Sequence, residues 1–125
     1  MFSKEERSSF SYWFAHWCAF QMTALNLHTW RFRFIFHDME KPWLKLFWPY
    51  DKVKKFHRTH NRHHPEYDGR KDWLGMVIDW ECSRFTKTAA PMNARETLES
   101  MKTRKPRWYP EMKKNIEPIL NKLGL

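Results

Sequence analysis

The chain has 125 residues, a length that fits one domain, and we expect residues 1–125 to form a single unit. Leu, Ile, Val and Phe contribute only 25 residues, but eight Trp, four Tyr and seven Met add apolar volume, which excludes a disordered chain. Three glycines are too few for an all-β protein with many tight turns. We therefore expect an all-α fold, a compact bundle of about five to seven helices.

Charge and histidine content are both uneven along the sequence. The net charge is +9, and residues 84–125 hold ten basic and four acidic residues, a net of +6. This excess indicates either a solvated basic surface or attraction to phosphate, in a nucleotide, a nucleic acid or an anionic membrane. All seven histidines lie between His16 and His64, which points to a local function for them.

The compartment follows from the cysteines and the absence of a signal segment. Cys18 and Cys82 form no CxxC pair, and the chain opens with charged residues rather than an apolar signal region. The longest apolar stretch, residues 12–20, is interrupted by His16 and is too short to span a bilayer. We predict a cytoplasmic protein without a membrane segment (in the host cytoplasm for a viral protein).

The first third of the chain predicts helices. Ser8 or Ser9 can cap a helix that runs to about residue 28. Residues 30–36 alternate as in a strand, but a single strand would have no partner, so we expect a short buried helix there. Pro42 and Pro49 enclose a short apolar segment, residues 43–48.

The remaining helices are predicted from caps and prolines. Asp51 is the expected N-cap of a helix that ends at Pro65, followed by a loop over residues 65–71. Asp72 is the expected cap of a helix to about residue 87, and Asn93 with Glu96 predicts a capping box for a helix to about residue 101. A last helix is expected over residues 111–123, kinked at residue 118, within a basic C-terminal segment of about 104–125.

Four features can carry chemistry. His37 and Asp38 are adjacent, and at a helix end both side chains can converge on a metal; otherwise they simply end a helix. His16 lies on the aromatic face of the first helix, where a hydrogen-bonded core histidine is the alternative to a ligand. Asp79 lies between Gly75 and Ser83, one turn away on either side, which leaves room for an ion or substrate; the alternative is a solvated face.

The fourth feature is a histidine cluster at residues 57–64. On one helix, His57, His60 and His64 form a single stripe, with His63 at its edge, and the flanking apolar residues indicate that this stripe faces inward. Buried imidazolium ions are costly, whereas a metal binds neutral imidazoles. The alternative is a wet basic helix with partly exposed histidines.

The order of these residues resembles the HD-domain superfamily of metal-dependent phosphohydrolases, which are all-helical bundles. Residues 10–100 are also similar to a family of small uncharacterised phage and bacterial proteins. The motifs that carry both resemblances are His16, His37-Asp38-Met39-Glu40-Lys41, His57-Arg58-Thr59-His60-Asn61-Arg62-His63-His64, Met76-Val77-Ile78-Asp79-Trp80 and Ala94-Arg95-Glu96.

The resemblance implies specific roles for these residues. It implies one metal ion bound by His16, His37, Asp38 and Asp79, while His57, His63 and His64 hold a second ion or bind phosphate. His28 and His60 have no counterpart in the family pattern, and we interpret them as structural or supporting residues.

The resemblance also implies a hydrolase that uses metal-activated water on a phosphoester, such as a nucleotide. We predict catalytic roles for Asp38 and Lys41, and phosphate contacts for Lys41, Asn61 and Arg95. A solvated surface lysine is the alternative for Lys41.

Nitrogen and oxygen ligands suit one or two divalent transition metals, with Mn or Fe favoured and Co, Ni or Zn as alternatives. Two other functions stay open. One is a nucleic-acid- or anion-binding module that uses the basic C-terminal third, where Arg104, Lys105 and Arg107 adjoin Trp108 and Tyr109. The other is an HD-type di-iron oxygenase on the same scaffold.

Overall fold

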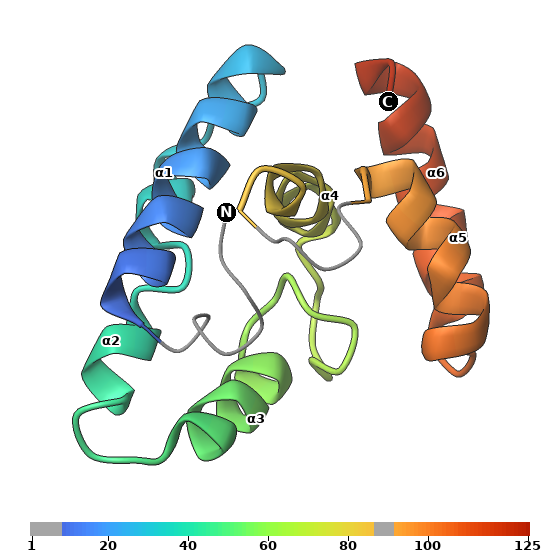
Figure 1. Cartoon of the computed structure of the whole chain (residues 1–125). Helices are drawn as coiled ribbons and strands as arrows, with labels where there is room; N and C mark the ends of the chain where they lie inside the picture. The colour runs from blue at the N-terminus through green and yellow to red at the C-terminus, as the bar shows by residue number, and fades with distance from the viewer. Residues whose placement is uncertain (1–8, 87–91) are drawn as a thin grey trace.

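The computed structural model describes residues 9–86 and 92–125, and these residues form helices and no strand (Figure 1). The finding confirms the predicted all-α bundle. The helices in chain order are α1 (Phe10–Asn26), the 3-10 helix η2 (Phe32–Phe36), α2 (Glu40–Leu44), α3 (Tyr50–His60), α4 (Trp73–Ser83), α5 (Ala94–Arg104) and α6 (Tyr109–Leu123).

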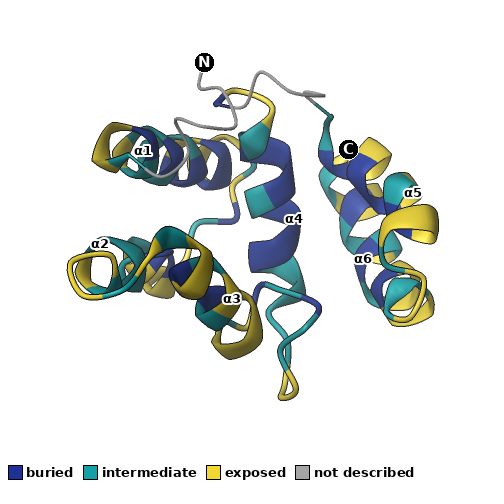
Figure 2. Cartoon of the chain, turned by 60° about the horizontal axis from the view of Figure 1, so that its bottom comes forward, coloured by how far each residue is buried: buried dark blue, intermediate teal, exposed yellow. Residues whose placement is uncertain are grey.

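Helix α4 lies at the centre of the molecule, between α1 on one side and the α5–α6 pair on the other (Figure 1). Most of this helix is buried (Figure 2), which explains why its sequence, WLGMVIDWECS, is mostly apolar. Towards α1, Ile78 and Cys82 pack against Phe20 and Phe34. Towards α5 and α6, the buried cluster consists of Met76, Val77, Trp80, Ala94, Leu98, Met101, Met112, Ile116 and Leu120.

Helix α1 holds the segment of residues 34–38 by three side-chain donors spaced one turn apart. Trp13 Nε1 donates to the carbonyl of Asp38 at 2.8 Å, and Trp17 Nε1 donates to the carbonyl of Ile35 at 2.9 Å. Gln21 Nε2 donates to the carbonyl of Phe34 at 2.6 Å. These bonds satisfy backbone carbonyls in a segment that forms only a short 3-10 helix, and they position the residues that follow it.

The segment of residues 30–36 differs from the prediction of a short buried helix. Only Phe34 of η2 is buried, whereas Phe32 and Phe36 are exposed. The alternation in the sequence therefore does not mark a buried helix face. Within η2, Phe34 alone packs into the core, and the aromatic side chains of Phe32 and Phe36 are exposed.

Helix α3 is shorter than predicted. It begins after Pro49, so Asp51 lies in its first turn rather than at its cap, and it ends at His60 instead of Pro65. Asn61 adopts an extended conformation, with φ −109° and ψ 130°. His63 and His64 therefore lie in the loop beyond the helix, and the predicted single stripe of histidines on one helix is wrong.

The predicted caps of three helices are confirmed, because Ser9, Asp72 and Asn93 accept hydrogen bonds from the backbone N–H groups of Tyr12, Gly75 and Glu96. Helix α4 ends at Ser83, earlier than predicted, and α5 extends to Arg104. Helix α6 runs through Pro118. The alternative cap Ser8 and the predicted helix end near residue 87 lie outside the described residues.

None of the helices in residues 9–86 and 92–125 combines the length and the hydropathy that crossing a bilayer requires.

Substitution of Asp72 by Ala is expected to lower the free energy of unfolding by about 1 kcal/mol or more, because it removes the cap of the central helix. The variant also loses the ion pair in which Arg33 Nη2 lies 2.9 Å from Asp72 Oδ1. Urea denaturation measures the change. Asp72→Asn separates the two effects, because an amide still caps the helix but carries no charge; the exposed Asp68→Ala serves as the control. An equal loss in Asp68→Ala would contradict the prediction.

The stability difference between the wild type and Asp72→Asn should depend on pH. Burial raises the pKa of Asp72, but the hydrogen bonds from Arg33 and from the backbone N–H of Gly75, together with the charge of Arg33, outweigh burial and hold that pKa below its usual value. A carboxyl group with a lowered pKa in the folded state stabilises the protein above its unfolded-state pKa, about 3.9. The difference should therefore disappear as the pH falls through the lower, folded-state pKa, and a difference that grows on acidification would contradict this assignment.

Candidate metal centre

Three side chains from three separate parts of the chain meet beside α4. His16 comes from α1, His37 follows η2, and Asp79 comes from α4. His16 Nε2 lies 2.9 Å from Asp79 Oδ1 and 3.2 Å from His37 Nε2, and the distance from His37 Nε2 to Asp79 Oδ1 is 3.1 Å. With Asp38, these residues form a group whose donor atoms all lie within 4.8 Å of one another.

Hydrogen bonding alone does not explain this triangle. An imidazole Nε2 offers one hydrogen or one lone pair in the ring plane, so His16 Nε2 cannot bond well to both of its neighbours. Nitrogen ligands about 2.0–2.1 Å from a metal, at roughly tetrahedral to octahedral angles, lie about 2.9–3.4 Å apart. The distances in the triangle match that spacing, so this group is positioned to hold a metal ion.

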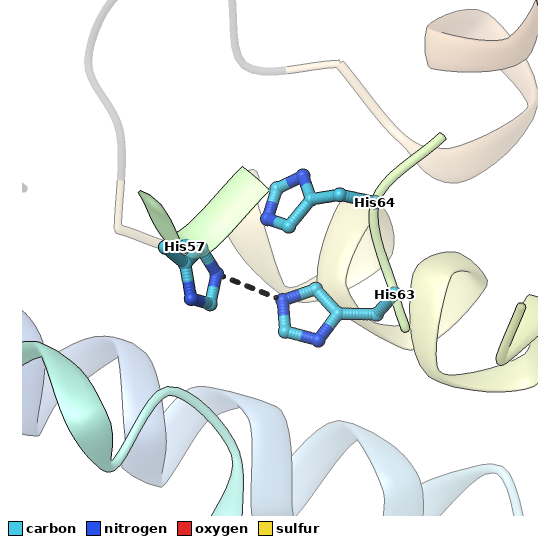
Figure 3. A group of neighbouring side chains, drawn as sticks. All are labelled: His57, His63 and His64. Carbon is cyan, nitrogen blue, oxygen red and sulfur yellow. Dashed lines mark hydrogen bonds between the residues drawn. The ribbon is translucent and has the colours of Figure 1, made fainter. Parts of the chain in front are cut away.

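A second triangle lies on the other side of Asp38. His57 Nε2 from α3 lies 3.2 Å from His63 Nε2, and these atoms are 3.0 Å and 3.1 Å from Asp38 Oδ1. His64 completes the histidine group, whose donor atoms also lie within 4.8 Å of one another. Figure 3 shows the three imidazole rings converging, one from the helix and two from the loop after it.

Asp38 joins the two groups. Its Oδ2 lies 3.5 Å and 3.7 Å from the Nε2 atoms of His37 and His16, while its Oδ1 faces His57 and His63. Oδ1 is buried and has no hydrogen bond of good geometry among the described residues. The residue is held at φ 57°, in the left-handed region that is costly for most side chains but that Asp tolerates better than most. A buried carboxylate oxygen without such a bond is a donor available to an ion.

Burial and neighbouring charges favour neutral imidazoles at two histidines and ionised carboxylates at the two aspartates. Burial, assisted by neighbouring His63, lowers the pKa of His37 to about 4, and burial lowers the pKa of His64 well below its usual value. Burial alone would raise the pKa values of Asp38 and Asp79, but their histidine neighbours, and Lys41 beside Asp38, hold both well below the usual range. Neutral imidazoles and ionised carboxylates are the states that metal ions bind.

Glu40 is a residue of the site that the sequence analysis missed. Its Oε1 contacts His57 Nδ1, on the side of the ring opposite the triangle, and accepts a hydrogen bond from Asn61 Nδ2 at 3.2 Å. Burial lowers the pKa of His57, but Asp38 and Glu40 outweigh burial and raise it. A carboxylate behind a metal-binding histidine fixes its tautomer and orientation. The available signal was Glu40's position within the His-Asp-x-x-Lys motif, two residues after Asp38.

A polar cavity of about 380 Å³ opens onto both groups. Lys41 reaches into it, with its Nζ 3.0 Å from Asp38 Oδ2, and Asp38 keeps the pKa of this lysine raised despite the opposing effect of burial. The residues that line the cavity are Tyr12, His16, Asp38, Lys41, Tyr50, Lys54, His57, Arg58, His64, Asp79 and Arg104. A second cavity of about 300 Å³, with Phe10, Trp13 and Leu46 in its wall, shares Tyr12, His16, Asp38, Lys41 and Tyr50 with the first.

Two residues predicted to contact phosphate lie outside the wall of the cavity of about 380 Å³. Arg95 is exposed on α5, where its Nε donates to the carbonyl of Leu125 and its Nη2 donates to Asn121 Oδ1, both at 2.8 Å. It is not among the residues that line the metal cavity. Asn61 supports Glu40, and it also lies outside the wall of that cavity. Asn61 lines a smaller cavity of about 260 Å³ together with His37 and His63. The contact of Asn61 and Arg95 with phosphate stays a prediction.

The small neighbours of Asp79 do not create space for an ion. A Cβ atom on Gly75 would lie 2.7 Å from Asp72 Oδ2, so this glycine makes room for the helix cap instead. Ser83 Oγ donates to the carbonyl of Asp79 at 2.7 Å. His28 and His60 are exposed and belong to neither group of donors.

Three cations of the C-terminal third have separate contacts. Arg104 lines the metal cavity, Lys105 pairs with Glu66, and the guanidinium of Arg107 lies 5.3 Å from the ring centre of Trp108. Of these three cations, Arg104 is the one that lines the cavity beside the candidate metal centre.

No family model, curated protein or solved structure matches this chain. The resemblance to HD-domain proteins therefore stays a prediction. What supports a metal centre is the spacing of the donor atoms and their burial.

Replacement of Glu40 by Gln is expected to weaken metal binding about 10- to 100-fold, because the carboxylate that orients His57 is lost while the size of the side chain is retained. Titration of the chelator-treated protein with Mn²⁺, followed by calorimetry, measures the affinity. Glu99→Gln, on the exposed surface of α5, is the matched control and should bind as the wild type does. Equal affinities for all three proteins would show that Glu40 does not support the centre.

Proposed function

We propose that the protein is a cytoplasmic metal-dependent phosphohydrolase of the HD-domain type, which hydrolyses a phosphoester with metal-activated water. The observation that carries the proposal is a pair of donor groups that lie on either side of one carboxylate, Asp38, and open onto a cavity lined by cations. Two ions on either side of a shared carboxylate would be close enough to act on one phosphate.

The cavity wall supports a phosphorylated substrate. Besides Lys41, the wall holds three further lysine or arginine side chains, and among the described residues its acidic members are Asp38 and Asp79, which the histidines already face. A positively charged cavity attracts anions. It also stabilises the negative charge that develops on the oxygens of the phosphoryl group during its transfer. The volume of about 380 Å³ falls within the range of small-molecule sites. The adjoining aromatic cavity supports an organic group on the substrate, and a nucleotide would meet both requirements.

The donor set favours Mn or Fe. The first group combines two imidazole nitrogens with two carboxylates, and the second places three imidazoles beside Asp38. Mixed nitrogen and oxygen donors suit these ions better than they suit a structural zinc site. Cys82 contributes no thiolate, since its Sγ donates to the carbonyl of Asp79 at 3.2 Å. The expected content is one or two ions per chain, with Co, Ni and Zn as the alternatives.

The roles of the residues follow from their positions. Bound divalent ions supply Lewis acidity, which lowers the pKa of water and offsets the negative charge of the phosphate. His16, His37 and Asp79 hold one side of the centre, and His57, His63 and His64 hold the other. Asp38 fixes the separation between the two sides. Lys41 balances the charge of Asp38 and presents a cation to a phosphate oxygen in the cavity.

A di-iron oxygenase is the second candidate, because a carboxylate shared between two histidine groups also suits two iron ions. The cations in the cavity wall favour the hydrolase, since dioxygen does not need them. Iron content together with consumption of oxygen would distinguish the oxygenase from the hydrolase.

Asp38→Asn and Asp79→Asn are expected to lose the bound metal and to lower phosphatase activity at least about 1,000-fold, because each removes an anionic ligand. Asparagine keeps the size of both side chains and tolerates the left-handed backbone at residue 38. Elemental analysis of protein purified without chelator gives the metal content, and hydrolysis of p-nitrophenyl phosphate with added Mn²⁺ gives the activity.

The exposed Asp68→Asn variant controls for the loss of one negative charge and should match the wild type in both measurements. Circular dichroism establishes that every variant keeps its helix content. A wild-type protein that carries no transition metal and binds none on titration would refute the proposed function.

A further inference from the structure

Three basic side chains line the outer part of the metal cavity and come from distant parts of the chain. Lys54 and Arg58 lie one turn apart on α3, and Arg104 is the last residue of α5. We call these three residues the basic subsite. Their presence in the wall of one cavity is a property of the tertiary structure, because 46 positions separate Arg58 from Arg104 in the sequence.

Within the described part of the chain, no acidic side chain forms an ion pair with a residue of the basic subsite. The lysines and arginines found in ion pairs there are others: Arg33, Lys41, Lys71, Arg84, Lys102 and Lys105. Lys54 Nζ lies 5.7 Å from the ring centre of Tyr50, and Arg104 Nη1 donates to the hydroxyl of Ser100 at 3.2 Å. Neither contact offsets a positive charge with a negative one.

The position of Arg104 is held by its neighbour. Lys105 pairs with Glu66, which lies in the loop that also carries His63 and His64. Both partners are partly buried, with about a fifth of each side chain exposed. This contact ties the end of α5 to the loop that supplies the metal-binding histidines, so Arg104 is brought to the cavity by a specific tertiary contact.

With two divalent ions bound, one phosphate does not account for the charge of the basic subsite. Two divalent ions would bring four positive charges and Lys41 a fifth, against three negative charges on Asp38, Asp79 and Glu40. A single phosphomonoester dianion cancels the remaining two. The three charges of Lys54, Arg58 and Arg104 then have no counterpart among the described residues that line the cavity.

We propose that the basic subsite binds a second phosphate of the substrate, so that the protein acts on small phosphoesters that carry two phosphate groups. One phosphate lies at the metal centre and the other contacts the basic subsite. This inference rests on the proposed function for the position of the first phosphate. Arginine and lysine recognise phosphate through charge-assisted hydrogen bonds, and these are strong where several converge on one group.

Non-hydrolysable probes test the proposal by binding alone. The Mn²⁺-loaded protein is titrated in a calorimeter with butylphosphonate and with linear α,ω-alkane bisphosphonates of three to six carbons. We expect the best bisphosphonate to bind about tenfold or more tightly than butylphosphonate. The double variant Lys54→Ala/Arg58→Ala, and separately Arg104→Ala, should lose most of this advantage while the affinity for butylphosphonate changes less than about threefold.

Matched controls remove the same charge from positions outside the cavity. Lys52→Ala/Lys55→Ala removes two exposed cations from α3, and Arg107→Ala removes one beyond the end of α5. Both controls should keep the preference for the bisphosphonate. Metal content and circular dichroism, measured for each variant, show that the centre and the fold are intact.

The proposal would be overturned if the wild type bound butylphosphonate and every bisphosphonate with equal affinity. It would also be overturned if the subsite variants lost affinity for both ligands equally, or if the control variants lost as much affinity for the bisphosphonate as the subsite variants do. Failure of the proposed function has a different signature. A protein that prefers bisphosphonates but hydrolyses neither butyl phosphate nor 1,4-butanediol bisphosphate would retain the basic subsite and lose the hydrolase assignment.

Discussion

The candidate centre depends on a single buried carboxylate. Asp38 faces two histidine groups with its two oxygens, and its backbone is held in the left-handed region to make this possible. The indole of Trp13 fixes its carbonyl, and Lys41 balances its charge. A charge in this position is costly to bury unless neighbouring groups or a bound ion compensate it, so the surrounding structure has to be built around that one residue.

Helices α1 and α4 position the groups that compensate this charge, and both helices are held in place by contacts outside the candidate centre. Helix α4 is held between two apolar clusters, which fixes the direction in which Asp79 projects. Helix α1 uses its indole and amide donors to hold residues 34–38, which places His37 beside His16. The centre therefore lies where packing has already made the backbone rigid, and little further ordering is needed for the donors to converge.

Local physics made part of this structure predictable from the sequence. The caps at Ser9, Asp72 and Asn93 follow from short-range hydrogen bonding, and they were predicted correctly. The end of α3 was not, because no proline or glycine marks the extended conformation of Asn61. Glu40 was missed since its role depends on a histidine 17 positions away, and the contacts of Arg95 with Leu125 and Asn121 were not predicted for the same reason.

The sequence by itself determined the helical class and the identity of the donors: the histidines at residues 16, 37, 57, 63 and 64 with Asp38 and Asp79. Residue type and order carry that information, because imidazole and carboxylate chemistry does not depend on the fold. Only the tertiary structure decided that the donors form two groups around one carboxylate, that Glu40 supports His57, and that Arg104 joins Lys54 and Arg58. Those relations depend on distances between segments that packing alone brings together.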